Sequence, residues 1–178
     1  QLRQWLQVHA PKAAELGQQR ELLRQIRNQV LQDWPDRSHE LGALRQESIR
    51  RLLVQAQEPQ ELAPLAYEVF ENQRQKVELY PDALAFLSFI NQHFPLLAIS
   101  NGTANVHRVG LGNYFVHGIN APSLGWAKPM PQIYLHASEL MGLQPHQVLH
   151  IGDDAHLDAW ASRNAGMACI WINRQGKD

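Results

Sequence analysis

The sequence of 178 residues has little that points outside the cell or toward large partners. Cys169 is its only cysteine, so no intrachain disulfide forms. No apolar run approaches the about 18 residues of a membrane span, and the first residues lack a signal-peptide pattern. The formal net charge is -1, without the broad basic field that nucleic-acid binding requires. These absences favour the cytoplasm, with neither nucleic acid nor a membrane as partner, and they carry no signal for an oligomeric state.

Residues 1–76 also lack any strand signal and are rich in Gln, Arg, Leu and Glu. Apolar residues recur at helical spacing, and two prolines, Pro35 and Pro59, interrupt the pattern. We therefore expect a bundle of amphipathic helices. Several arginines share a basic face of this region. The default interpretation is that this face is solvated, and the alternative is that it guides an anionic substrate. The arginines of this face are Arg24, Arg27, Arg45, Arg50 and Arg51.

Residues 77–178 alternate apolar runs of strand length with helical patterns. A run that is apolar on both faces is typical of a central parallel strand covered by helices on both sides. The alternation predicts an α/β fold with a doubly wound parallel sheet and right-handed crossovers. The expected strands cover residues 95–99, 116–120, 148–152 and 168–172, and the expected helices cover 81–93, 103–110, 131–141 and 155–164.

Polar residues follow two of these strands or lie in the loop between them. Ser100, Asn101 and Gly102 offer a hydroxyl and two amides to a phosphate oxygen, although such residues also form ordinary turns. Lys128 precedes Pro129 in a stiff, largely apolar loop, where one ammonium can serve both a carboxylate and a phosphoryl group. The alternative for Lys128 is an exposed loop lysine.

Three carboxylates, Asp153, Asp154 and Asp158, follow the strand that ends at Gly152. Each pair at ~4 Å would repel by about 4 kcal/mol at an effective dielectric of ~20, so we expect a cation among them. Hard oxygen ligands with room for water favour Mg²⁺ over Zn²⁺. The alternatives are that Asp153 is a helix N-cap and Asp158 a solvated helical residue. His150 precedes the cluster, and we expect its side chain to face out of the strand.

Together, Ser-Asn-Gly-Thr after one strand, Lys-Pro in a later loop and Gly-Asp-Asp-x-x-x-Asp after another strand resemble motifs of the haloacid dehalogenase superfamily. The chain looks most like its small bacterial phosphatases that act on flavin mononucleotide or sugar phosphates. The resemblance implies a Rossmann-like core over residues 77–178 and an α-helical cap domain over residues 1–76. It also implies hydrolysis of a small phosphorylated metabolite through an aspartyl phosphate.

The resemblance also implies a role for each motif residue. Ser100, Asn101 and Gly102 would bind the phosphate, and Lys128 would neutralise charge between nucleophile and phosphate. Asp153 would bind Mg²⁺, with Asp154 and Asp158 completing or orienting its shell.

The nucleophile motif of the family, Asp-x-Asp after the first strand, is absent from these 178 residues. We expect it in a segment before Gln1, because a sheet without that strand would expose a central edge. One alternative is a binding module without a nucleophile that retains phosphate and Mg²⁺ affinity. A true haloacid dehalogenase is a weaker alternative, because the acidic cluster would repel a nucleophilic aspartate that no metal neutralises.

Overall fold

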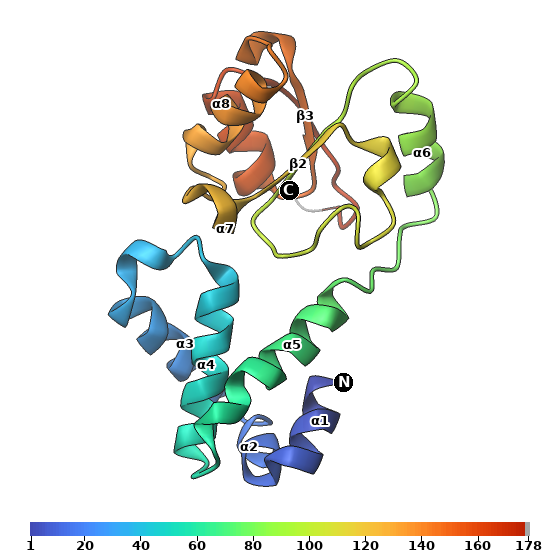
Figure 1. Ribbon diagram of the computed structural model, residues 1–178. Coiled ribbons are helices and arrows are strands. Elements are labelled where there is room, and N and C mark those ends of the chain that lie inside the picture. Colours follow the sequence, from blue (N-terminus) through green and yellow to red (C-terminus); the bar gives the residue numbers. More distant parts are fainter. Residues whose placement is uncertain (177–178) are drawn as a thin grey trace.

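The computed structural model describes residues 1–176, which form a helical part and an α/β part joined by an extended segment after Arg74 (Figure 1). The helical part contains five α-helices, and none of the helices in the described residues is long and apolar enough to cross a membrane. Their bounds are α1 Leu2–His9, α2 Pro11–Leu16, α3 Arg20–Asp33, α4 Leu41–Gln55 and α5 Ala63–Arg74.

The apolar faces of these helices bury one core. Ile26, Leu52 and Leu53 lie at its centre, and Ala66 brings α5 against it. The breaks come at the expected prolines, since Pro35 opens the 3₁₀ turn η1 (Pro35–Arg37) and Pro59 directly precedes η2 (Gln60–Leu62). The prediction of an amphipathic bundle over this region is confirmed.

The α/β part contains four short strands in two parallel pairs. β1 (Leu97–Ser100) pairs with β2 (His117–Asn120), and β3 (Leu149–Gly152) pairs with β4 (Ala168–Trp171). α6 (Ala83–Ile90) precedes β1, and α8 (Pro131–Leu140) lies between the two pairs in sequence. α8 packs against β1 and against α9 (Ala161–Asn164), so one helical layer serves both pairs. The predicted α/β class with parallel strands is confirmed.

Three local predictions in the α/β part differ from the structure. Residues 103–110 form turns, because the Asn105 side chain accepts hydrogen bonds from the amides of His107 and Arg108 and the chain reverses at Gly110, whose φ is +82°. Residues 121–124 form a short helix, α7 (Ala121–Leu124), where a loop was expected. The helix after β3 begins as a π-helical segment, η5 (Ala155–Trp160).

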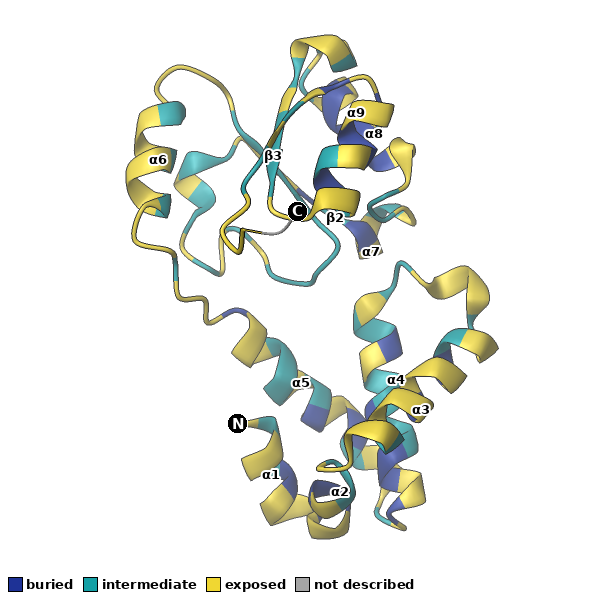
Figure 2. Cartoon of the chain, turned by 180° about the vertical axis from the view of Figure 1, so that it is seen from behind, coloured by how far each residue is buried: buried dark blue, intermediate teal, exposed yellow. Residues whose placement is uncertain are grey.

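The two strand pairs leave much apolar surface open. Within residues 1–176, β1 pairs only with β2 and β3 only with β4, so each of these strands keeps one unpaired edge. No residue of β1, β3, β4 or α6 is fully buried, and Phe89 on α6 is 61% exposed (Figure 2). The core beneath α8, by contrast, is closed to solvent at Ile133 and Tyr134, which are fully buried.

Candidate active site

The carboxyl ends of β1 and β3 carry the two motif loops, and Lys128 connects them. Asn101 holds the backbone of Lys128 through two hydrogen bonds: its Nδ2 donates to the Lys128 carbonyl at 2.8 Å, and its Oδ1 accepts from the Lys128 amide at 2.7 Å. In the loop after β1, the Gly102 amide donates to Ser100 Oγ at 3.0 Å. The Asn101 side chain therefore positions Lys128, which leaves phosphate binding at this residue to its backbone amide.

Lys128 reaches across to the loop after β3 and binds Asp158. The Nζ–Oδ1 distance is 2.6 Å, and the side chains are only 14% and 4% exposed. Asp158 also contacts His150 Nε2 at 3.1 Å and accepts from the Asp154 amide at 3.0 Å. Burial alone would raise the pKa of Asp158, but the hydrogen bonds from His150 and Lys128 hold it well below its ordinary value. Asp158 is therefore a buried carboxylate whose charged form is favoured by its partners.

Gly152 makes this packing possible. A Cβ added at Gly152 would overlap the side chain of Asp158, from Cβ to the carboxylate. Only glycine lets the strand end lie this close to the aspartate. The Gly-Asp-Asp motif thus begins with a residue that seats Asp158 against the backbone.

The three carboxylates of the motif have different surroundings. Asp154 is the N-cap of η5, and its Oδ1 accepts from the amides of His156 and Leu157 at 2.9 and 2.7 Å. The Asp153 carboxylate has no hydrogen-bond or ion-pair partner in the described residues and lines a cavity of about 450 Å³ with Gly152 and Trp171. Trp171 Nε1 donates to the Asp153 carbonyl at 3.0 Å. Asp153 therefore has free oxygens toward a cavity.

The acidic motif by itself does not form a closed metal site. Within residues 1–176 no three His, Cys, Asp or Glu side chains gather closely enough to hold a metal ion. Two of the three aspartates are occupied by amides, Lys128 and His150. The assignment of Asp153, Asp154 and Asp158 to a metal stays a prediction.

A family model for haloacid dehalogenase-like hydrolases matches residues 4–166, which is nearly the whole chain. The chain belongs to the haloacid dehalogenase-like hydrolases. This confirms the resemblance inferred from the motifs and the fold that it implied.

Relatives within the family include phosphatases and dehalogenases. The chain is 29% identical to the Escherichia coli 5-amino-6-(5-phospho-D-ribitylamino)uracil phosphatase YigB, covering 90% of this chain and 69% of that protein. It is also 29% identical to a Thermus thermophilus phosphoserine phosphatase, covering 75% of this chain and 56% of the relative. Among solved structures, a 2-haloacid dehalogenase from Pseudomonas syringae superimposes with a TM-score of 0.91 at 34% identity, covering 99% of this chain and 78% of that one.

The structure of this hydrolase adds residues that the motifs did not reveal. The expectation that His150 faces out of its strand is wrong: the side chain is 11% exposed and lies against Asp158, because the buried carboxylate needs a second donor. Tyr134, fully buried on α8, donates its hydroxyl to the Leu157 carbonyl and so anchors η5. Burial and then the charge of Asp158 raise the pKa of Tyr134. Neither role has a signal in a single sequence.

The helical part of the hydrolase is fastened to the loop after β1 by a polar network. Thr103 Oγ1 donates to Glu71 Oε2 at 2.6 Å. The buried Gln75 donates to the Thr103 carbonyl at 3.1 Å and accepts from the Asn105 amide at 3.0 Å. The last turns of α5 therefore hold the segment that directly follows Ser100, Asn101 and Gly102.

Proposed function

We propose that the complete protein is a Mg²⁺-dependent phosphatase of the cytoplasm that hydrolyses a small phosphorylated metabolite, with residues 1–76 as its cap and 77–178 as its core. The observation that supports this most strongly is the continuous set of contacts from Asn101 through Lys128 to Asp158 across the ends of β1 and β3. It gives one ammonium a fixed place beside the Ser100 loop. Phosphoryl transfer depends chiefly on such positioning and charge neutralisation.

In this proposal each motif has one task. Ser100 Oγ and the amides of Asn101 and Gly102 bind phosphate oxygens. Lys128, held by Asn101 and Asp158, neutralises charge on the transferring phosphoryl group. The Asp158 carboxylate holds the Lys128 ammonium in place and does not itself react.

The nucleophile, in this proposal, is an aspartate outside the 178 residues. The unpaired edges of β1 and β3 support it, because a parallel strand between them would complete the sheet and cover a central edge. The carboxyl end of such a strand would lie between the Ser100 loop and the Asp153 loop. A nucleophile there would form the aspartyl phosphate that the family resemblance implies.

The residues present fit a magnesium ion with few protein ligands. Mg²⁺ keeps several waters and is commonly held by one or two carboxylates together with substrate phosphate. Asp153, with free oxygens on a cavity, would be one such ligand, and Asp154 and Asp158 would hold the loop that presents it. When bound, the ion would polarise the phosphoryl group and offset charge on the nucleophile.

Dehalogenation is the second candidate, and the likeness to the Pseudomonas syringae 2-haloacid dehalogenase favours it. A carboxylate nucleophile can attack either phosphorus or a carbon that bears a halide. The exposed Asp153 argues for the phosphatase, because a free carboxylate next to a nucleophilic aspartate repels it unless a cation lies between them.

The test assays the complete protein with p-nitrophenyl phosphate and a panel of phosphomonoesters, with and without Mg²⁺, and with 2-chloropropionate. We expect Mg²⁺-dependent phosphate release, abolished in Asp153→Asn and unchanged in the control Glu139→Gln, whose side chain is 83% exposed. Chloride release with no phosphate release would establish the dehalogenase. Phosphate and Mg²⁺ binding without turnover of either substrate class would establish a binding module.

A further inference from the structure

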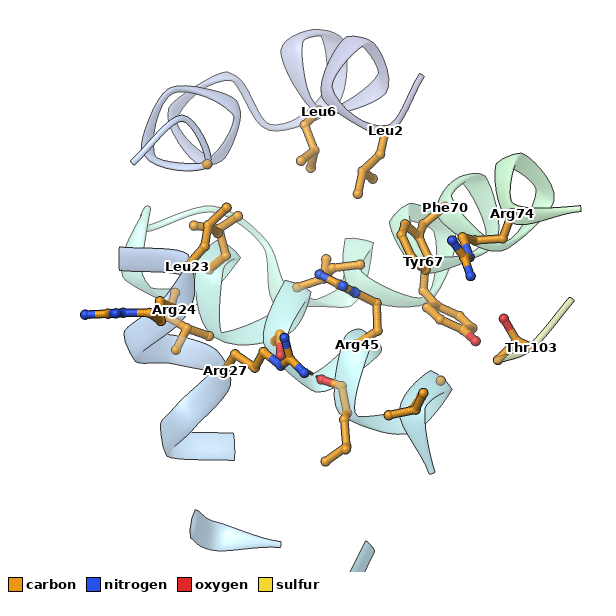
Figure 3. Close-up of a pocket in the computed structure, with 18 of the residues that line it drawn as sticks. Leu2, Leu6, Leu23, Arg24, Arg27, Arg45, Tyr67, Phe70, Arg74 and Thr103 are labelled. Atoms are coloured by element: carbon orange, nitrogen blue, oxygen red, sulfur yellow. Dashed lines mark hydrogen bonds between the residues drawn. The ribbon is translucent and has the colours of Figure 1, made fainter. Parts of the chain in front are cut away.

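A second cavity, of about 760 Å³, opens in the helical part and ends at the loop after β1 (Figure 3). Leucines of α1, α3 and α4 form much of its lining, and Gly102 and Thr103 lie at one end. This volume is within the range of small-molecule sites, which are mostly apolar with a few polar groups. The cavity therefore extends from the proposed phosphate loop into the cap.

Five arginines line this cavity. Two of them are Arg3 and Arg24, and the other three come from three different helices: Arg27 of α3, Arg45 of α4 and Arg74 of α5. In the part of the chain that the structure describes, none of the three has a carboxylate within ion-pairing distance. Arg45 lies over the ring of Phe70, with 4.9 Å between its guanidinium carbon and the ring centroid. The cavity thus gathers positive charge that the described residues do not neutralise.

The other arginines of this region differ. Arg24 pairs with Glu21 at 3.1 Å, and Figure 3 shows its side chain directed away from Arg27 and Arg45. Arg50 and Arg51 both pair with Glu47 and do not line the cavity. These three arginines therefore each have a carboxylate partner, whereas Arg27 and Arg45 have none in the described residues.

The charges in the cavity act on one another. Removal from water lowers the pKa of Arg45, and the positive charges of Arg27 and then Arg74 lower it further. A bound anion would relieve this repulsion on Arg45, because it would give the guanidinium a partner of opposite charge. The resting arrangement is therefore one that an anion would stabilise.

Arg74 connects this cluster to the proposed phosphate site. A Cβ placed on Gly102 would lie 3.6 Å from Arg74 Nη2 and 3.4 Å from Ser100 Oγ. The guanidinium and the hydroxyl thus flank the same small space beside Gly102. Arg27 and Arg45 line the same cavity farther from Thr103 (Figure 3).

We propose that Arg27 and Arg45 bind a second anionic group on the substrate, a carboxylate or a phosphate carried by its leaving group. The substrates would then be phosphomonoesters of anionic alcohols, with Arg74 between the two anionic ends. Guanidinium suits this task because its planar donors match carboxylate and phosphate oxygens in pairs. The inference deepens the proposed function and rests on its phosphate site.

Binding of non-hydrolysable phosphonates tests this directly in the complete protein, without reliance on turnover. Calorimetry would compare phosphonoacetate and 3-phosphonopropionate with ethylphosphonate and propylphosphonate, which have the same carbon counts but no carboxylate. We expect the wild-type protein to bind each phosphonocarboxylate at least about tenfold more tightly than the alkylphosphonate of the same carbon count. One charge-assisted hydrogen bond provides a gain in affinity of this size. Arg27→Gln and Arg45→Gln should each reduce this preference to about threefold or less while alkylphosphonate binding stays unchanged.

The matched control is Arg50→Gln, on the same helix as Arg45 but paired with Glu47, and it should keep the preference. Methylenebisphosphonate, run alongside, distinguishes a second phosphate from a carboxylate. Equal binding of the two series by the wild type, or a preference that survives in both arginine variants, overturns the inference and leaves the proposed phosphate site standing. Failure of every phosphonate to bind overturns both.

Discussion

Replacing Lys128 with methionine removes the ammonium of the Lys128–Asp158 pair while keeping most of the side-chain volume. The pair is 2.6 Å long and its carboxylate is 4% exposed, so the variant leaves a buried negative charge with fewer donors. Loss of one partner from a buried pair costs about 3–5 kcal/mol. His150 and the Asp154 amide still bind Asp158, so we expect a loss of about 2–3 kcal/mol in the free energy of unfolding.

Urea unfolding of the wild type, Lys128→Met, Asp158→Asn and the double variant gives the coupling energy of the pair. Lys12→Met is the control, because the Lys12 side chain is exposed and has no ion pair in the described residues. Its stability should change by no more than about 0.5 kcal/mol.

The effect of Lys128→Met should also depend on pH with a definite sign. The pKa of Asp158 is lowered in the folded protein, so its stabilising contribution is complete above the unfolded value of 3.8. The contribution is lost as the pH falls below that value toward the folded pKa. The difference between wild type and Lys128→Met should therefore shrink below about pH 4. A loss equal to that of Lys12→Met at pH 7, or a coupling energy near zero, would refute the view that Asp158 depends on Lys128.

Three further predictions concern other parts of the site. Gly152→Ala should lower the free energy of unfolding by about 1–3 kcal/mol in urea and lower the rate of phosphate release, because its methyl group displaces Asp158; unchanged stability and rate would contradict this. Glu71→Gln should lower the free energy of unfolding in urea by about 1–2 kcal/mol, because it weakens the hydrogen bond that Thr103 donates; the exposed Glu68→Gln is the control. Chelation with EDTA should abolish phosphate release in the complete protein, Mg²⁺ should restore it, and activity that persists after chelation would contradict a metal requirement.

The order of helices and strands was predictable because its signals are local. The apolar run before Ser100 and the one before Gly152 each became a parallel strand, and the prolines ended helices where expected. The turns over residues 103–110 were not predictable. Their conformation depends on Gln75, a buried side chain from the helical part that binds the Asn105 amide. A partner this far away in sequence leaves no periodic pattern.

In the candidate site, too, some residues had a local signal in the sequence and others did not. Ser100 and Asp153 were predicted from residue type and position after a strand, and Lys128 was predicted from its loop before Pro129; their roles stay predictions. The role of His150 was not predicted, because a strand alternates its faces and the sequence does not say which face meets the Asp158 carboxylate. The division of Arg27 and Arg45 from Arg50 and Arg51 also required coordinates, since all four are arginines on amphipathic helices and differ only in what lies opposite them.

The three carboxylates of the acidic motif differ in how many hydrogen-bond partners they have, so they are not equivalent candidates for a metal ligand. Lys128, His150 and a backbone amide bind the Asp158 carboxylate, and two amides at the start of η5 donate to one oxygen of Asp154. Asp154 and Asp158 thus hold the turn after β3. Losing Asp154 would leave two backbone amides without an acceptor, and losing Asp158 would leave Lys128 without its carboxylate partner. Asp153 and Asp154 both line the cavity, and in the described residues Asp153 has no partner on either carboxylate oxygen. A cation bound at this turn would therefore gain most from Asp153, which is why replacing that residue separates metal binding from folding.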